Sequence, residues 1–458
     1  MPLPDRPRLR RAPLAPLFVT ELRTLLAGWA LWAVLLLLCP VVGYGFIQAL
    51  ALYGEASRSA SSFPELARGL SPLDGVLVPT FGAFYVATTL LFPFVAIRAL
   101  GAEKADGGLK LMLQLPYRST TLIAIKLAVV LVGWLLTALP GLSALLLWAL
   151  LGGHLWLPET LTLLLGHLLY GLLIACVGLF AAAVTDGPAT AAIVALAFTL
   201  GAWILDFAGA GQGEWMRRLA DLSPTAALRT FETGLLAAPA VLGMLIAAAG
   251  FAALATLWLR PGPPDRRRVL LSASIVTVTL AAAALGGQTS FYLDTTENRR
   301  NSFAPGDEAA LRKIAGPLAI TVHLSPEDPR LADFDRQVLG KLRRLLPNLD
   351  VTLAATAKTL FSQADDDRYG LVTYTYHGVQ AESRSTSPRE VLPLIYELTG
   401  VVADPSAATD YAGYPTVANA SLVAPWFYGV LPAVVALAWW QSRRPARAFQ
   451  LRATGERP

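Results

Sequence analysis

The chain has 458 residues, of which 55% are hydrophobic and only 15% are charged. Soluble domains carry charge on about a quarter of their residues, so this composition excludes an ordinary soluble domain. The formal net charge is +5, but the basic residues lie at the ends of hydrophobic runs, which is typical of membrane proteins and argues against nucleic-acid binding. The two cysteines, Cys39 and Cys176, lie inside apolar runs without a CxxC motif, so neither a disulfide scaffold nor a cysteine metal site is expected.

The hydrophobic runs predict a polytopic α-helical membrane protein. A spanning helix needs roughly 20 mainly apolar residues. About eight runs meet this condition, at 26–50, 76–98, 122–151, 157–184, 188–208, 237–259, 268–287 and 423–441. The first run follows a basic N-terminus but has no A-x-A-like cleavage site after it, so it is expected to be a retained span.

The distribution of Lys and Arg predicts the orientation of these spans. If the spans alternate from a cytoplasmic N-terminus, the cytoplasmic segments hold 19 basic residues and the short outer loops hold 5. Long translocated domains do not follow this rule, so the short loops decide the comparison. We therefore expect both termini in the cytoplasm, and the Ala, Leu and Arg-rich composition points to a bacterial cytoplasmic (inner) membrane.

Residues 288–422 differ from the rest because they are polar and alternate strand and helix patterns. Hydrophobic residues alternate in 318–324 and again in 349–353, as in strands with one buried face, whereas those of 331–345 follow helical spacing. A last helix is expected to begin at a capping box formed by Ser387, Pro388 and Glu390. The predicted order is helix, strand, helix, three strands and helix, which indicates an inserted extracytoplasmic α/β domain. Residues 401–422 are expected to be a tether back to the membrane.

The segment between the second and third runs, residues 98–126, is too short to span a membrane and too apolar for a solvated loop. Leu109, Leu111, Met112, Leu113 and Leu115 predict a short helix at the cytoplasmic surface with an apolar side. Such a helix either rests on lipid headgroups or docks on a partner protein, and the residues alone leave both open.

This segment resembles the coupling-helix region of ABC-2 type transporter permeases. That family has an acidic residue, a Gly-Thr-Leu-like step and a following Pro between its second and third spans. The matching residues here are Glu103, Gly107, Gly108, Leu109 and Pro116, with Lys104 beside the acidic residue. Gly108 stands where the family has Thr, so the hydroxyl contact of that Thr is absent.

The resemblance implies an ABC-2 type permease domain with six spans at 1–262, followed by a seventh span at 263–287. It implies that Glu103–Pro116 contacts a separate cytoplasmic ATPase, and that the permease works as a homodimer or heterodimer and exports its cargo. ATP would bind the partner subunit, and this chain would need no cofactor of its own.

A second resemblance covers about 288–400, which is similar to the auxiliary domain of gliding-motility-type ABC transporters. The residues that carry it are Asp294, Thr295, Leu311, Ile314, Pro317, Ile320, Val322, Ser325, Glu397 and Thr399. It implies that 288–422 is an extracytoplasmic, thioredoxin-like domain with its tether, and that 423–458 is the last span with a basic cytoplasmic tail. The second lobe of longer family members is missing.

The sequence predicts no enzymatic activity. A P-loop needs G-x-x-x-x-G-K-[ST], whereas the one Gly-Lys pair, Gly340–Lys341, is followed by Leu342. His154 and His167 are expected to pack between helices, and Asp206 to end a span at the outer interface. The run Asp365–Asp367 is expected to be a solvated loop, and His323 and His377 are not expected to be catalytic.

Three functions are compatible with these patterns. The first is the permease subunit of an ABC exporter. The second is an ATPase-driven lever that acts on periplasmic or envelope machinery without moving a cargo, and the third is a membrane-anchored scaffold. The first two require a cytoplasmic ATPase, and the second adds a periplasmic partner. The spans carry few internal charges, so the sequence does not identify a cargo.

Overall fold

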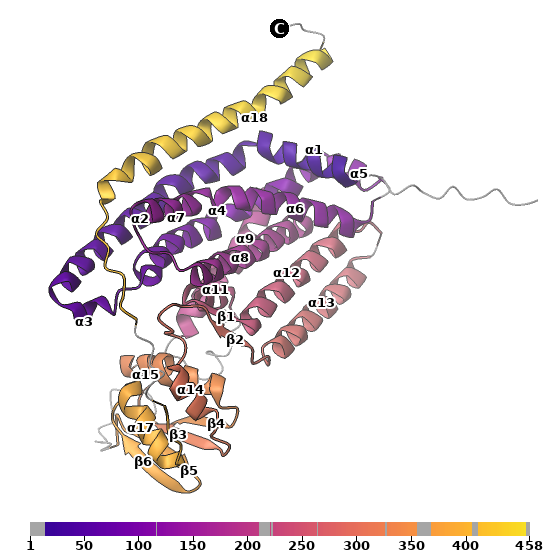
Figure 1. Ribbon diagram of the computed structural model, residues 1–458. Helices are drawn as coiled ribbons and strands as arrows, with labels where there is room; N and C mark the ends of the chain where they lie inside the picture. The colour runs from indigo at the N-terminus through magenta and orange to yellow at the C-terminus, as the bar shows by residue number, and fades with distance from the viewer. Residues whose placement is uncertain are drawn as a thin grey trace, which may run out of the picture.

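The computed structural model describes residues 14–115, 117–209, 220, 223–262, 264–325, 328–354, 368–404 and 411–454. A bundle of long helices makes up most of the chain, and a small α/β domain lies beyond one end of it (Figure 1). We call that end of the bundle the domain side, and the opposite end, which carries α5 (Gly108–Met112), the α5 side.

Within the described residues, eight helices are long and apolar enough to cross a membrane, which confirms the predicted multi-pass helical architecture. They are α2 (Trp29–Ser62), η1 with α4 (Leu73–Leu77, Val78–Ala105), α6 with α7 (Ser119–Thr137, Leu139–Leu150), α8 (Leu157–Val184), α9 (Pro188–Gly209), α12 (Ala238–Leu259), α13 (Asp265–Gly286) and η5 with α18 (Trp426–Val430, Leu431–Thr454). Several begin or end beyond the predicted apolar runs, because polar residues next to a run continue the same helix.

The bundle is built around α8. Its most apolar stretch is 72% buried, whereas that of α13 is only 6% buried. Gly178 of α8 faces Ala96 of α4 so closely that an added Cβ would lie 2.6 Å from the Ala96 Cβ. A hydrogen bond of 2.9 Å between the hydroxyls of Thr89 and Tyr170 joins the same two helices. Small residues and internal hydrogen bonds are how helices associate in a membrane, where the hydrophobic effect does not drive them together.

Shorter elements connect these helices. They are α1 (Leu14–Ala27), α3 (Pro64–Ala67), α11 (Pro224–Glu232), β1 (Leu235–Ala237), β2 (Tyr292–Asp294) and η4 (Ala420–Leu422). The strands β1 and β2 pair antiparallel, with Leu235 opposite Asp294. This small ribbon ties the chain leaving α13 to the chain entering α12.

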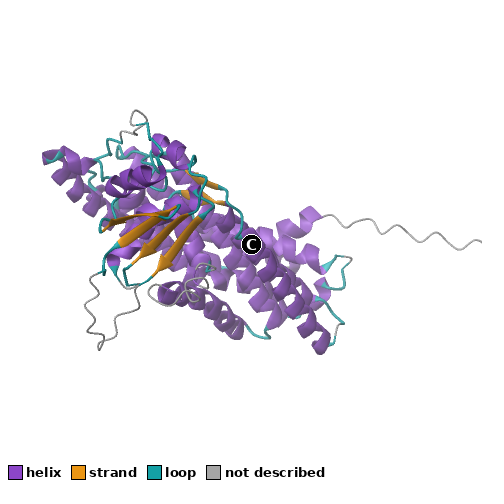
Figure 2. Cartoon of the chain, turned by 90° about the horizontal axis from the view of Figure 1, so that it is seen from below, coloured by secondary structure: helices purple, strands orange, loops and turns teal. Residues whose placement is uncertain are grey.

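The α/β domain has the predicted order of elements. They are α14 (Pro305–Leu311), β3 (Leu318–Val322), α15 (Pro329–Phe334), η2 (Asp335–Leu339), α16 (Gly340–Leu345), β4 (Leu349–Leu353), β5 (Val372–Tyr376), β6 (Val379–Ser383) and α17 (Pro388–Thr399). The strand order is β4-β3-β5-β6, with β3 and β4 parallel and the other neighbours antiparallel. Strands are drawn in orange in Figure 2. Leu318, Ile320 and Val322 of β3 are buried, as their alternation predicts.

The capping box of α17 differs from the expectation drawn from the sequence. Helix α17 begins after Ser387, but the Ser387 side chain makes no capping hydrogen bond. His377 lies in the turn between β5 and β6, with a φ of 47°. The run Asp365–Asp367 lies outside the described residues.

Candidate functional site

The predicted coupling segment is divided between two helices. Glu103 and Lys104 belong to the last turn of α4, which ends at Ala105, and Gly107 then turns the chain with a φ of 77°. The following α5 has only five residues, begins at Gly108 and has no side-chain cap at its N-terminus. Because a non-glycine residue is strained at positive φ, Gly107 suits this reversal.

Helix α5 has one buried side and one exposed side. Leu109 is 8% exposed and packs against a cluster that includes Ile97 and Ile123. Leu111 and Leu115 are 67% and 46% exposed. The segment is thus anchored to the bundle by Leu109 and presents two leucines on its outer side.

Glu103 joins a buried ionic cluster on Lys126 of α6. The Lys126 Nζ donates to Glu103 Oε1 at 2.7 Å, to Glu21 Oε2 at 2.9 Å and to the Ala99 carbonyl at 2.9 Å. The Lys126 side chain is only 2% exposed. One ammonium therefore binds α1, α4 and α6 together next to the coupling segment, in a place where an unpaired charge would be costly.

Lys104 links the same segment to α8. Its Nζ donates to the carbonyls of Ala183 and Thr185, the former at 3.2 Å, and lies 3.9 Å from the Asp186 carboxylate. These carbonyls lie at the C-terminal end of α8, where a cation is favoured by the helix dipole.

Glu103, Lys104, Gly107, Gly108 and Leu109 thus lie together at the junction of α4 and α5, whereas Pro116 lies outside the described residues. Sequence reasoning missed Glu21 and Lys126. A lysine inside an apolar run was the available signal, because such a charge needs a partner. Spacing along one helix could not identify that partner, since Glu21 is 105 positions away.

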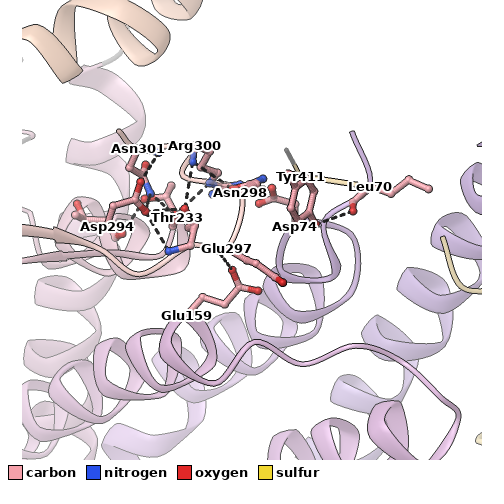
Figure 3. A network of polar contacts seen from close by, with 12 residues as sticks. Leu70, Asp74, Glu159, Thr233, Asp294, Glu297, Asn298, Arg300, Asn301 and Tyr411 are labelled. Carbon is pink, nitrogen blue, oxygen red and sulfur yellow. Dashed lines mark hydrogen bonds and ion pairs between the residues drawn. The ribbon is translucent and has the colours of Figure 1, made fainter. Parts of the chain in front are cut away.

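A second polar site lies at the domain side and holds the α/β domain to the bundle (Figure 3). We call it the clamp: residues 294–302 and 411–416, together with the bundle residues they bond. Its centre is the Asp294 carboxylate, which accepts from the Thr296 hydroxyl at 2.6 Å, the Ser302 hydroxyl at 2.8 Å and the Asn301 amide at 3.0 Å. Asp294 therefore fixes the shape of the loop that follows β2.

The loop 295–302 is hydrogen-bonded to the C-terminal end of α11. Arg300 Nε and Asn301 Nδ2 both donate to the Thr233 carbonyl, at 3.1 and 2.7 Å. The Thr295 hydroxyl donates to the Gly234 carbonyl at 2.8 Å. The Arg300 guanidinium also forms an ion pair with Asp74 of η1, so the loop reaches the start of α4 as well.

Glu297, in the same loop, connects the loop to His154, to α8 and to the tether. Its carboxylate is 2.8 Å from His154 Nε2 and accepts from the Tyr414 hydroxyl, and its backbone amide faces Glu159 Oε2 at 3.4 Å. The rings of His154 and Tyr414 stack at 3.6 Å. The hydrogen bond to Glu297 raises the pKa of the Tyr414 hydroxyl above its usual value.

The tether returning to the last span docks on α2 and α3. The Tyr53 hydroxyl donates to the Tyr414 carbonyl at 2.7 Å, and the Thr416 amide donates to the Ser57 hydroxyl at 3.0 Å. Gly413 has a φ of 77°, and a Cβ there would lie 1.7 Å from the Ala67 carbonyl oxygen. Only glycine can lie so close to that backbone.

Two cations of α16 complete the clamp from the domain. Lys341 Nζ donates to the Ser302 carbonyl at 2.9 Å, and Arg344 donates to the Asn301 carbonyl. Burial lowers the pKa of the Lys341 ammonium from 10.5 to about 8, and burial also lowers the pKa of Arg344.

The Lys341 shift predicts how stability depends on pH. An unfolded chain keeps this proton up to about pH 10.5, so between pH 8 and 10 the unfolded state binds more protons than the folded state. The free energy of unfolding of the α/β domain should therefore rise over this window, by at most about 1 kcal/mol per pH unit. In Lys341→Met this rise should be smaller, whereas Lys313→Met, at an exposed lysine, should retain it. The difference is measured by urea unfolding of the full chain at pH 7.5 and 9.5, monitored by protease cleavage within the domain. An equal rise of the free energy of unfolding in both variants would contradict the assignment to Lys341.

Two helices run from one site to the other. The continuous helix Leu73–Ala105 has 33 residues, or about 50 Å of length; Asp74 at its start is in the clamp and Glu103 at its end is in the ionic cluster. Helix α8 does the same, from Glu159 at the clamp to Ala183 beside Lys104. The α4–α5 segment and the clamp are thus joined by two continuous runs of helix, Leu73–Ala105 and Leu157–Val184.

His167 and Asp206, the other polar residues considered within the spans, contact side chains of neighbouring helices. His167 lies between Phe81 and Phe84, with its Nε2 3.6 Å from Glu232, and Asp206 pairs with Arg229 at 3.0 Å. Within the described residues, no group of three or more His, Cys, Asp and Glu side chains could hold a metal ion.

In comparisons with known proteins, no protein-family model, no curated protein and no solved structure matches this chain. The geometry of these two sites and the sequence patterns therefore carry the functional argument.

Proposed function

We propose that this chain is the permease subunit of an ABC transporter, an exporter driven by a separate cytoplasmic ATPase. The observation that carries the proposal is the α4–α5 segment: it is anchored to α1, α4, α6 and α8 by Leu109, Lys104 and the Lys126 cluster, and it presents Leu111 and Leu115 outward. A partner that pushes on those leucines would move four helices together. Glu103 and Lys104 act in this proposal from inside the bundle, as the anchors of the segment.

The proposal includes the arrangement of the chain. Residues 1–262 would form the ABC-2 type domain with both termini in the cytoplasm of a bacterium, and the domain side would face the periplasm. A thioredoxin-like assignment of the α/β domain is supported by its strand order, in which a β-α-β unit is followed by a hairpin and a helix. The domain contains no CxxC motif, so binding and not thiol redox chemistry is proposed for it.

The clamp favours a second candidate function, the mechanical lever. An outer domain that only captured a cargo could hang on flexible linkers. This one is bonded to the ends of α4, α8 and α11, so a tilt of these helices would turn it. ATP-dependent accumulation of a defined solute in inverted vesicles would favour transport, and ATP-dependent binding of an envelope protein without any flux would favour the lever.

Introducing a negative charge at Leu111, the exposed leucine of α5, tests the coupling segment. Leu111→Asp should abolish copurification of a Walker-motif ATPase from native membranes in mild detergent, because an ionised side chain cannot be buried at an apolar contact. The matched control is Leu66→Asp, an exposed leucine (54%, against 67% for Leu111) at the domain side, which should retain the ATPase. Mass spectrometry identifies the bound proteins. If the wild type recovered only envelope proteins and no ATPase, the permease proposal would be contradicted and the scaffold function favoured.

A further inference from the structure

An open pocket of about 440 Å³ lies on the α5 side of the bundle, between two segments that are far apart in sequence. One wall is the end of the α5 region and the start of α6, including Leu113, Tyr117, Arg118, Ser119 and Thr120. The other wall is the turn between α12 and α13, at Arg260. Figure 1 shows α5 and the α12–α13 turn at the same end of the bundle.

The pocket is lined for an anion. Its lining includes two arginines, Arg118 and Arg260, and the hydroxyl-bearing residues Ser119 and Thr120, and no acidic residue lines it. Within the described part of the chain, neither Arg118 nor Arg260 forms an ion pair with a carboxylate. The acidic residues on the adjoining segments pair elsewhere, Asp265 with Arg268 at 3.7 Å and Asp186 with Lys104 at 3.9 Å.

The start of α6 adds to this polarity. This helix has 19 residues, and no side chain caps its N-terminus. The first amides of an uncapped helix and the positive end of its dipole favour an anion. Guanidinium groups and hydroxyls together are the donors that bind phosphate oxygens.

The position of the pocket at the ends of two spans indicates which phosphate compound it would bind. The third span begins at Ser119 and the sixth ends at Leu259, so the pocket lies where both helices leave the apolar layer. Lipid phosphates lie at this level, and basic pockets between spans are known to bind anionic headgroups. Leu113, at the pocket wall, would face the acyl chain or the glycerol below the phosphate.

We propose that this pocket binds the phosphate group of an anionic phospholipid. The bound headgroup would bridge the coupling segment and the α12–α13 turn through Arg118 and Arg260, and so fix the position of the coupling segment. The proposal goes beyond the permease function and does not depend on it.

The test uses the purified full chain and counts the lipids it retains by native mass spectrometry. The probes are phosphatidylglycerol, phosphatidylcholine and inorganic phosphate, offered to wild type and to the double variant Arg118→Gln, Arg260→Gln. The double variant should bind phosphatidylglycerol on the order of twentyfold more weakly, because each basic residue near an anionic headgroup contributes about fivefold. Both arginines are exposed, so the variant is expected to fold, which its unfolding temperature checks.

The matched control is Arg266→Gln, Arg267→Gln, which removes the same charge from exposed positions of α13 outside the pocket. It should change phosphatidylglycerol binding by less than about threefold, since neither side chain lines the pocket and exposed charges outside it are partly screened by salt. An equal loss in both double variants, or equal binding of phosphatidylglycerol and phosphatidylcholine by wild type, would overturn the proposal. If inorganic phosphate binds as tightly as phosphatidylglycerol, and only the pocket variant loses it, the lipid assignment is rejected and free phosphate replaces it. No ATPase takes part, so failure here leaves the permease proposal standing.

Discussion

Replacing Lys126 by Met should destabilise the bundle by about 3–5 kcal/mol, the usual cost of removing one partner of a buried ion pair. The methionine fills a similar volume, but the Glu21 and Glu103 carboxylates then share a buried site without the ammonium that now donates to both. Loss of this cluster should also release the end of α4, and with it the coupling segment. Thermal unfolding in detergent and the protease sensitivity of residues 98–118 measure the two effects.

A matched triple variant separates charge from packing. In Lys126→Met, Glu21→Gln, Glu103→Gln the two carboxylates are replaced by neutral amides, so most of the lost stability should return. If the single variant were as stable as wild type, or the triple variant no more stable than the single one, the ionic cluster would not be the contact that holds α1, α4 and α6 together.

The second large effect is expected for Gly413→Ala. A Cβ at this position would lie 1.7 Å from the Ala67 carbonyl oxygen. The Cβ is fixed by the backbone of residue 413 and the oxygen is a backbone atom, so no side-chain rotation relieves the clash. The tether must therefore move off α3, which breaks the hydrogen bonds of Tyr414 to Tyr53 and to the Leu70 carbonyl. We expect a loss of more than about 3 kcal/mol and rapid protease cleavage between 401 and 422.

Gly378→Ala is the control for this variant. Gly378 also has a positive φ, 84°, but a Cβ there meets no atom within 4 Å. It therefore reports the cost of the backbone conformation alone, about 1 kcal/mol. Equal effects of the two substitutions would mean that the close approach of Gly413 to Ala67 does not hold the tether in place.

The spans and the order of elements in the α/β domain could be predicted from sequence because they depend on local periodicity. An apolar run of 20 residues is helical whatever it packs against, since its backbone groups must bond internally in lipid. The alternation of Leu318, Ile320 and Val322 likewise fixes which face of β3 is buried.

The clamp could not be predicted in this way, because its partners are distant in sequence and its contacts are made by backbone groups. His154 contacts Glu297, which is 143 positions away in the sequence. Arg300 and Asn301 donate to the backbone carbonyl of Thr233, and because every residue has such a carbonyl, the sequence does not single this one out. His154 lies in the loop between α7 and α8, so no helical spacing relates it to Glu297. Glu103 was singled out by the resemblance to ABC-2 type permeases, whereas its contact with Lys126 depends on the packing of α1, α4 and α6.

The most direct test of the account is whether ATP bound at the α5 side changes the clamp at the domain side. Hydrogen exchange of residues 290–302 and 411–416 would be measured in the full chain, purified together with the ATPase that the proposal requires, with ADP and again with ATP trapped by vanadate. The account predicts that trapping alters the protection of the Asn301 and Thr416 amides, while amides of the β3–β5 ladder within the α/β domain stay unchanged. Identical exchange at the clamp in both nucleotide states would contradict a permease whose coupling segment drives the outer domain through α4 and α8.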